Sequence, residues 1–317
     1  MLDYLGLPRI SSLRDLSAEI NLSEYTLFLM SRNTDLYYKE VAVPKKNGGT
    51  RLLACPSSEI KAIQAWILRN ILEKISVSRY ATAFKKDVNV LHNARIHIGN
   101  LYVLCMDIED FFGSIKANKV YSFFIKLGYS RQAALLFTKF CTYKGCLPQG
   151  GVTSPALSNI LNRDLDTKIS NVCKSLNVFY TRYADDLTFS SNNLKKLREI
   201  RNNIEEILNS EGYRVNTKKT RLRWPGTRRE ITGLIYSDNN SEVRIGKRTK
   251  KILRAKIHHL ESGLEKNEDR YYKLFYHLVG WMSYLHSVDL KTYNQLLRYW
   301  NSLNSNNAFV AVSRSFD

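Results

Sequence analysis

The sequence predicts an α+β fold, in which a mixed region of strands and helices precedes a helical one. Two apolar, strand-like runs contain acidic residues, at 101–112 and 177–191. A third pattern, strand-like at 37–43 and 50–54 around a glycine pair, is typical of a hairpin. From residue 247 onward, apolar residues recur mostly at helical spacing. The chain has 317 residues, which is long for one core and indicates two or three packed subdomains.

Helical spacing of apolar residues also occurs within the mixed region. One helical segment is predicted over residues 12–32 and another over 59–76, where Ser57 or Ser58 can cap the first turn. A glycine-rich loop then opens a helix with Ser154 as its cap. The remaining elements are short strands between 213 and 245 and helices near 118–127, 130–141 and 194–209.

Positive charge is the strongest signal in the composition. The chain has 48 Lys and Arg against 29 Asp and Glu, a net charge of +19. Such an excess on a chain that can bury a core indicates a polyanionic partner, most often nucleic acid. The alternative is a basic protein without such a partner.

The sequence gives no sign of a membrane segment or of export. Membrane-spanning helices need about eighteen or more consecutive apolar residues, and the chain has no such run. The first residues, MLDYLGLPRISSLRDLS, carry charges among their apolar positions and differ from a signal peptide. We therefore expect a cytoplasmic protein that does not contact a membrane.

The cysteines favour reduced thiols over a metal site. The chain has five, an odd number, and none forms a paired CxxC pattern. Buried, reduced side chains are the expected state, and a zinc site is the weaker alternative.

Three acids are predicted to meet at one edge of a sheet. Asp107 ends the first apolar run, and Asp185 and Asp186 lie between the strand-like halves of the second. Neighbouring carboxylates raise each other's pKa, so the cluster needs positive charge. Carboxylate oxygens suit Mg²⁺ or Mn²⁺, and two such ions can hold the attacking and leaving oxygens of a phosphoryl transfer. The alternative is a solvated turn without chemistry.

Ordered motifs give the chain a resemblance to bacterial reverse transcriptases. YADD at Tyr183–Asp186 is similar to the palm signature of that family, and DIEDFF at Asp107–Phe112 resembles its first catalytic block. NAxxH at Asn93–His97 resembles a motif of the retron branch, whose VTG motif is matched here except for Ile231. The other matching blocks are LPQGGVTSPALSN at 147–159, EGYRVNTKKT at 211–220 and ITGL at 231–234.

The resemblance implies an α+β right-hand polymerase with fingers, palm and thumb. Residues 1–100 would form N-terminal helices and fingers, 101–245 the palm with its antiparallel sheet, and 246–317 a helical thumb. The implied reaction is RNA-templated DNA synthesis from deoxynucleoside triphosphates with two Mg²⁺ ions, or Mn²⁺.

The retron branch implies more specific partners. Its enzymes bind a cognate structured non-coding RNA, prime from an RNA 2′-OH and leave a branched RNA–DNA hybrid, msDNA. They act with an accessory effector protein in defence against phages. Two alternatives stay open: another bacterial type, such as that of group II introns, or a scaffold that holds the hybrid and an effector.

The resemblance also implies the ligands of the metal ions. Asp107 and Asp185 are expected to bridge both ions, and Asp186 to be oriented toward them without constant ligation. The backbone carbonyl of Ile108 is the further ligand. Glu109 and Asp110 have either a site role or a simpler one, capping of the next helix or surface charge.

Five residues correspond to the nucleotide-binding positions of the family. Phe112 matches the steric gate that excludes a ribose 2′-OH, with core packing as its alternative. Gln149 matches the loop that lines the incoming nucleotide. Arg51 and, less firmly, Lys45 are placed on the hairpin to hold the triphosphate. Lys219 matches a lysine that protonates pyrophosphate, or it only screens phosphate charge.

RNA contacts are expected from two regions. Asn93 and His97 have either a structural or an RNA-contacting role, and Arg182 either touches the template or only lies on a strand. In the first C-terminal helix, basic residues share one face and an apolar stripe another, which is typical of a helix that packs on a core and follows phosphates. The alternative is a solvated basic face. The basic residues proposed to bind RNA are Lys247, Arg248, Lys251 and Arg254.

Overall fold

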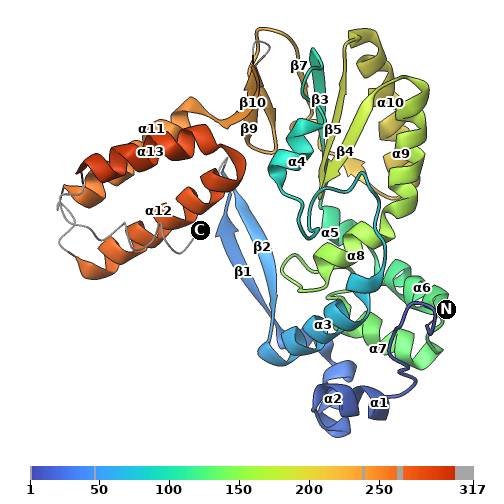
Figure 1. Ribbon diagram of the computed structural model, residues 1–317. Helices are drawn as coiled ribbons and strands as arrows, with labels where there is room; N and C mark the ends of the chain where they lie inside the picture. Colours follow the sequence, from blue (N-terminus) through green and yellow to red (C-terminus); the bar gives the residue numbers. More distant parts are fainter. Residues whose placement is uncertain (1, 46–47, 238–239, 263–266, 304–317) are drawn as a thin grey trace. The chain divides into compact units, whose positions relative to one another are not determined.

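The computed structural model describes residues 2–45, 48–237, 240–262 and 267–303 (Figure 1). The chain forms two compact units, each described by itself below. Unit 1 comprises Met1–Val88 and Leu104–Leu222, and unit 2 comprises Asn89–Val103 and Arg223–Asp317. The division into fingers, palm and thumb at residues 100 and 245 stays a prediction.

Two helices begin unit 1 where the sequence predicted a single helical segment. These are α1 (Leu13–Ile20) and α2 (Glu24–Arg32). Asn21 has φ 54°, a left-handed conformation that ends α1, and the Ser23 side chain accepts a hydrogen bond from Thr26 N and caps α2. The helical prediction over 12–32 is therefore confirmed, with a break after Ile20 that the apolar spacing did not show.

The predicted hairpin is present. Strand β1 (Tyr38–Pro44) pairs antiparallel with β2 (Thr50–Pro56), and the glycine pair between them has φ of 87° and 79°. Nearly all of β1 and the first half of β2 are exposed, whereas the end of β2 is packed. The hairpin therefore joins the core only at its base.

The helix after the hairpin is shorter than predicted. Helix α3 (Ser58–Asn70) is capped by Ser57, whose Oγ accepts from Ile60 N at 3.4 Å, and a 3₁₀ turn, η2 (Leu72–Lys74), follows. A 3₁₀ turn, η1 (Thr34–Tyr37), also precedes β1.

A five-stranded sheet is the centre of unit 1. Four of its strands follow one another in the order β4, β5, β3, β6, and β7 is the fifth. Helices α9 and α10 pack against β4 and β5 (Figure 1). The bounds are β3 (Tyr102–Glu109), β4 (Phe179–Tyr183), β5 (Asp186–Ser191), β6 (Arg214–Val215), β7 (Arg221–Arg223), α9 (Arg163–Ser175) and α10 (Leu194–Ser210).

The glycine-rich loop leads into a helix that differs from its prediction. Helix α8 (Ser154–Leu161) has Thr153 at its cap position without a side-chain hydrogen bond, so Ser154 begins the helix and does not cap it. Asn162 separates α8 from α9 and accepts a hydrogen bond from Tyr213 OH at 2.7 Å. The other helices of unit 1 are α5 (Phe111–Ser114), α6 (Ala117–Leu127) and α7 (Arg131–Cys141).

Unit 2 combines a small sheet with helices. Strands β8 (Arg229–Ile231), β9 (Leu234–Ser237) and β10 (Asn240–Ile245) form an antiparallel sheet, and α4 (Val90–Arg95) packs against β9 and β10. Three helices that contact one another follow (Figure 1). They are α11 (Lys247–Glu261), α12 (Glu268–Val288) and α13 (Leu290–Leu303).

The α+β class predicted from the sequence is confirmed by these helices and antiparallel sheets. No helix in the described part of the chain is both long and apolar enough to cross a membrane. None of the five cysteines forms a disulfide, and Cys141 and Cys173 are buried.

Candidate active site

The structure brings the two predicted acid-bearing segments together. Strand β5 lies next to β3 in the sheet, and the N–H of Ile108 donates to the carbonyl of Asp185 at 3.0 Å. Asp107 is buried, Asp185 is half-buried and Asp186 reaches solvent as the first residue of β5. The three carboxylates therefore share one edge of the sheet, as expected.

Burial and repulsion among the three acids raise the pKa of two of them. Burial raises the pKa of Asp185, and the charge of Asp107 adds to the rise. Although Asp186 reaches solvent, burial of its carboxyl and then the charges of Asp185 and Asp107 raise its pKa to about 7. Both shifts disfavour the ionised forms, so the edge is a place where a cation is stabilised.

Lys219 already supplies one positive charge to this edge. Its Nζ donates to both carboxylate oxygens of Asp107, at 2.9 Å to Oδ1 and 2.8 Å to Oδ2. Burial disfavours the charged ammonium of Lys219. The hydrogen bonds that it makes to Asp107, together with the negative charge of Asp107, outweigh this effect and raise the pKa of Lys219. The lysine of the EGYRVNTKKT motif is thus a counter-ion of the first predicted metal ligand.

The acids fit divalent cations in their chemistry. Carboxylate oxygens are the hard, anionic ligands that Mg²⁺ and Mn²⁺ prefer. The raised pKa values of Asp185 and Asp186 mean that a bound cation would favour their ionised forms. Among the described residues, no three acidic, histidine or cysteine side chains are grouped closely enough to hold one ion. The carboxylate oxygens of Asp107 are bonded to the Lys219 ammonium in this structure.

The hairpin places one of its two predicted cations near the acids. Arg51 is exposed on β2, and its charge opposes the rise in the pKa of Asp185. Lys45 is also exposed, and its backbone N–H donates to the Gly49 carbonyl at 3.0 Å. The preference for Arg51 over Lys45 in triphosphate binding stays a prediction.

The predicted gate lies in an aromatic cluster. Phe112 is half-buried, and its ring centroid lies 5.4 Å from that of Phe111 and 6.3 Å from that of Phe84. Phe84 is 49% exposed and has φ 56°, an uncommon conformation for a bulky residue. No sequence motif singles out Phe84.

Asp110 does not cap the helix that follows it. It stands at the cap position of α5 with φ 41°, and its side chain makes no capping hydrogen bond. A Cβ at Gly113 would lie 2.1 Å from Asp110 Oδ2, so a larger residue there would require the Asp110 carboxylate to move. Glu109 ends β3 and is exposed. The helix-capping alternative is therefore wrong for Asp110, while a surface role for Glu109 stays open.

The loop that contains Gln149 is fixed to the hairpin and to α3. Its Gln149 carbonyl accepts from Ala54 N at 2.9 Å. Gly150 has φ 131°, and a Cβ there would lie 2.7 Å from the Ala54 carbonyl oxygen. The buried Gln64 side chain accepts from Val152 N at 2.8 Å. Glycine is required here by close backbone approach.

Arg182 belongs to the protein interior. It has no exposed side-chain surface and forms an ion pair with Asp166, with 2.8 Å between Nε and Oδ1. Of the two roles left open by the sequence, a template contact does not agree with this burial.

Two of the predicted RNA-binding residues are also buried. Asn93 and His97 have no exposed surface, and burial lowers the pKa of His97 to about 3. Asn93 Nδ2 donates to Thr232 Oγ1 at 3.4 Å, so the NAxxH and ITGL motifs meet within unit 2. The burial favours the structural role over direct RNA contact.

The first C-terminal helix has the two faces that were predicted. Leu253, Ile257 and Leu260 of α11 are buried. Arg254 is exposed but lies over the Tyr299 ring, with its Cζ 4.1 Å from the centroid. The basic residues that are exposed on this helix include Lys247, Arg248, Lys251 and Arg254.

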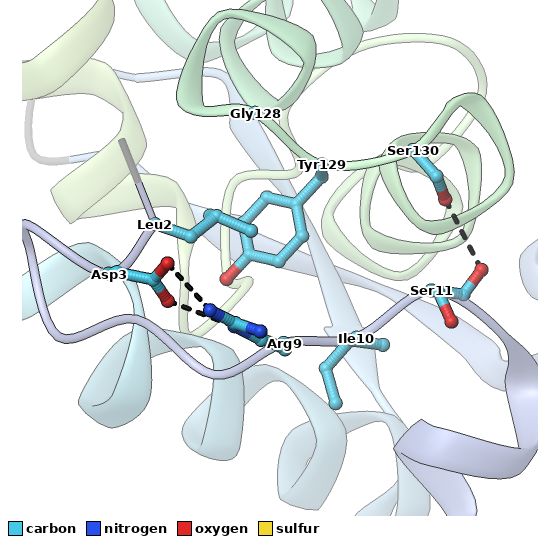
Figure 2. Close-up of a pocket in the computed structure, with 8 residues that line it drawn as sticks. All are labelled: Leu2, Asp3, Arg9, Ile10, Ser11, Gly128, Tyr129 and Ser130. Carbon is cyan, nitrogen blue, oxygen red and sulfur yellow. Dashed lines mark hydrogen bonds and ion pairs between the residues drawn. The ribbon is translucent and has the colours of Figure 1, made fainter.

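A pocket of about 530 Å³ lies in unit 1 apart from the predicted catalytic acids (Figure 2). Its lining includes the ion pair between Arg9 and Asp3, and Ser130, whose Oγ donates to the Ser11 carbonyl at 3.2 Å. None of the predicted site residues lines it. The pocket is therefore not the predicted active site.

Comparison with known proteins identifies the family. Residues 43–245, more than half of the chain, match the family described as "Reverse transcriptase (RNA-dependent DNA polymerase)". The chain belongs to the reverse transcriptase family. Reverse transcriptases bind an RNA template, are RNA-directed DNA polymerases and generally use divalent metal ions. The right-hand polymerase fold expected from the sequence agrees with this membership.

Two relatives narrow the assignment to the retron branch. The retron Ec86 reverse transcriptase of Escherichia coli is 40% identical over 301 residues, which cover 94% of this chain and 91% of the relative. The retron Mx162 reverse transcriptase of Myxococcus xanthus is 30% identical over 319 residues, which cover 90% of this chain and 65% of the relative. This reverse transcriptase is thus a member of the bacterial retron group, as the motifs predicted.

A solved telomerase is also similar to this reverse transcriptase. The telomerase of Candida albicans, solved with a fragment of telomeric RNA, has a TM-score of 0.49 and 11% identity. The match covers 86% of this chain and 60% of the telomerase. The family assignment rests on the sequence matches.

Three residues that hold the site in place were not predicted from the sequence. Gln64 lies within the buried isoleucine stripe of α3, and Asp166 and Asn159 lie on buried faces of α9 and α8. Their signal is a polar residue within or beside a buried apolar face. A single sequence did not show which of the many polar residues on these helices point inward.

Proposed function

We propose that this retron reverse transcriptase copies a cognate structured non-coding RNA into DNA, starting from a 2′-OH of that RNA. The product is a branched RNA–DNA hybrid, msDNA. The observation that carries the proposal is the meeting of Asp107, Asp185 and Asp186 at one sheet edge, in a chain 40% identical to the retron Ec86 enzyme.

Asp107, Asp185 and Asp186, with the carbonyl of Ile108, would hold two Mg²⁺ or Mn²⁺ ions. Such ions, when bound, neutralise charge on the reacting phosphate and lower the pKa of the attacking hydroxyl. The raised pKa values of Asp185 and Asp186 support this role, because a cation offsets the cost of ionising them. The N–H of Ile108 donates a hydrogen bond to the carbonyl of Asp185, and this bond fixes the position of the YADD turn relative to β3.

The other site residues would bind the deoxynucleoside triphosphate. Arg51 is an exposed cation close enough to Asp185 to affect its pKa, which supports a contact with the triphosphate, and Lys45 is a weaker candidate. Phe112 would exclude a ribose 2′-OH, and the loop of Gln149 would line the nucleotide. Lys219, released from Asp107, would hold or protonate the departing pyrophosphate.

The RNA would be bound mainly through phosphate contacts. The net charge of +19 and the exposed basic residues of α11 support this, since phosphate neutralisation supplies much of the affinity for nucleic acid. Asn93 and His97 would act by holding α4 against the ITGL segment. Resemblance to retron enzymes supports two further parts of the proposal: an accessory effector protein and a role in defence against phages in the cytoplasm.

Co-purification tests the proposal. The protein is expressed with its native flanking DNA, purified with its bound nucleic acid, and the nucleic acid is sequenced and treated with a debranching enzyme. We expect one RNA–DNA species whose DNA is released by debranching.

Asp185→Asn tests the acids in the same preparation. An amide is a much poorer ligand for Mg²⁺ than a carboxylate, so this variant should bind the RNA but contain no DNA. The exposed Asp164→Asn on α9 is the matched control and should retain the hybrid. DNA of normal yield in the Asp185→Asn preparation would refute the metal-ligand role, and unbranched DNA in the wild type would refute 2′-OH priming.

A further inference from the structure

A polar cluster without access to solvent lies behind the YADD turn. Arg182 of β4 and Asp166 of α9 form a two-pronged ion pair, with Nε 2.8 Å from Oδ1 and Nη2 2.8 Å from Oδ2. Both side chains have 0% exposure. Tyr180 OH donates to the same Oδ1 at 2.9 Å. The carboxylate of Asp166 therefore holds the guanidinium through both of its oxygens and accepts a third hydrogen bond from Tyr180.

The remaining guanidinium nitrogen points toward the catalytic turn. Arg182 Nη1 donates to Asn159 Oδ1 at 3.2 Å and to the carbonyl of Ala184 at 3.4 Å. Ala184 has φ 56°, a left-handed conformation that is unfavourable for alanine. The next residue, Asp185, is held from β3 through Ile108 N. The turn that carries the acids is thus held from two sides.

The same cluster also holds the segment that leads to Phe84. The backbone of Arg182 accepts from Thr82 N and donates to the carbonyl of Tyr80, both at 2.8 Å. Asn159 Nδ2 donates to the carbonyl of Ala83 at 2.8 Å. Phe84 follows directly with φ 56°, and its ring lies beside that of the gate residue Phe112.

A buried ion pair is a poor device for stability alone. Desolvation of two charges offsets most of their attraction, and apolar pairs of similar volume often replace buried ion pairs without loss of stability. An apolar pair, however, offers no donor to the Ala184 carbonyl or to Asn159. The directional hydrogen bonds are what this pair adds to the fold.

We propose that Arg182, clamped by Asp166, is a positioning residue that sets the conformation of the catalytic turn and, through Asn159, the backbone that precedes Phe84. Sequence motifs alone assign no role to Asp166. The inference rests on the proposed roles of Asp185 and Phe112.

The test compares single and double apolar replacements. Asp166→Leu and Arg182→Met alone each leave an unpaired buried group and should lower the melting temperature strongly. The double variant Asp166→Leu/Arg182→Met removes the unpaired charge but leaves the buried Tyr180 OH without its acceptor, so it should recover part of the lost melting temperature. We expect its kcat for primer extension to stay at least about tenfold below wild type, because small displacements of reacting groups are costly. Its preference for deoxyribonucleotides over ribonucleotides should also fall.

Recovery of both stability and full kcat in the double variant would overturn the proposal and leave the pair a structural one. The exposed pair Arg201 and Glu205 on α10 provides the matched control. Arg201→Met/Glu205→Leu makes the same chemical change and should alter neither kcat nor sugar preference.

Asn159→Ala decides the question if the double variant does not fold. It keeps the ion pair and removes the bonds to Arg182 Nη1 and to the Ala83 carbonyl. We expect reduced kcat and weaker sugar discrimination in a folded protein, and wild-type values of both would overturn the proposal. Asp185→Asn is assayed in parallel. If Asp185→Asn is active, the proposed function is contradicted. If Asp185→Asn is inactive but the double variant is fully active, only this inference is contradicted.

Discussion

Lys219 and Asp107 form an ion pair in which one ammonium bonds both carboxylate oxygens, at 2.9 and 2.8 Å. Asp107 is the acid at the end of β3, and its side chain is only 8% exposed. The pair means that the site carries its own counter-ion before any divalent cation binds. On the proposed role of Asp107 as a metal ligand, a divalent cation would displace this ammonium.

Lys219→Met tests this exchange. Without its partner, the buried Asp107 carboxylate should cost about 1–3 kcal/mol of stability, which is a few degrees in melting temperature. Added Mg²⁺ should raise the melting temperature of the variant more than that of the wild type, because no ammonium competes for Asp107. Thermal melts with and without Mg²⁺ measure both effects. Lys218→Met, at the exposed neighbouring position, is the control; an equal response to Mg²⁺ in all three proteins would contradict the exchange.

Phe112→Val tests the gate. A smaller side chain leaves space beside the sugar, so the variant should incorporate ribonucleotides more readily relative to deoxyribonucleotides. The ratio of kcat/KM for the two nucleotide types measures this. Phe123→Val, a half-buried change on α6, is the control. If Phe112→Val and its control both keep the wild-type ratio, Phe112 serves only in packing.

Asp186 predicts a pH dependence of metal binding. Its pKa is raised to about 7 in the folded chain, so the folded form binds this proton more tightly than the unfolded form. Ionising Asp186 as the pH rises from about 4 to 7 thus destabilises the metal-free protein. A divalent cation competes with the proton, so Mg²⁺ should raise the melting temperature more at pH 8 than at pH 6.

Melting curves at the two pH values, with and without Mg²⁺, test this expectation. In Asp186→Asn, the increase in melting temperature caused by Mg²⁺ should differ less between pH 6 and pH 8 than it does in the wild type. An identical Mg²⁺ response of the wild type at both pH values would show that Asp186 does not titrate in competition with the ion.

The basic face of α11 predicts a salt dependence of RNA binding. Each phosphate contact contributes about 0.7 to 0.9 to the slope of log affinity against log salt. Lys247→Gln/Lys251→Gln should therefore flatten the slope by roughly 1.5 if both lysines touch phosphate. Arg254 is left unchanged because it packs on Tyr299. Binding of the co-purified RNA, measured at several salt concentrations, gives the slope.

A variant with the same change of charge controls for net charge. Lys195→Gln/Arg198→Gln removes two exposed cations from α10. We expect its slope to match that of the wild type. If the wild type and both double variants have equal slopes, the basic face of α11 is solvated and does not bind RNA.

The catalytic strands and the hairpin could be predicted because local patterns decide them. The apolar runs around Asp107 and Asp185 specify strands, and a glycine pair specifies the hairpin turn. The breaks at Asn21 and Asn162 could not be predicted in the same way. Asn162 interrupts an apolar stripe that continues through it, and its side chain bonds Tyr213, which is 51 residues away. Such a break depends on tertiary contacts.

The cluster around Arg182 could not be predicted from the sequence either. An arginine within an apolar strand needs a carboxylate if it is buried, but two acids, Asp164 and Asp166, lie close together on the same helix. Only the rotation of α9 against the sheet decides that Asp166 faces inward while Asp164 is exposed. Burial of Asn93 and His97 is likewise a property of packing that their motif did not reveal.

The hairpin packs on the rest of unit 1 only at its base, and this has a consequence for how the enzyme can diverge. Most side chains of β1 contribute little buried surface, so substitutions there have little effect on folding. Arg51 lies in the exposed half of β2. Substitutions in the exposed half of the hairpin, which carries the proposed triphosphate contact Arg51, should therefore leave the sheet that carries the acids undisturbed. Sequence drift among close descendants of this chain should accumulate on β1 faster than on β3 or β5.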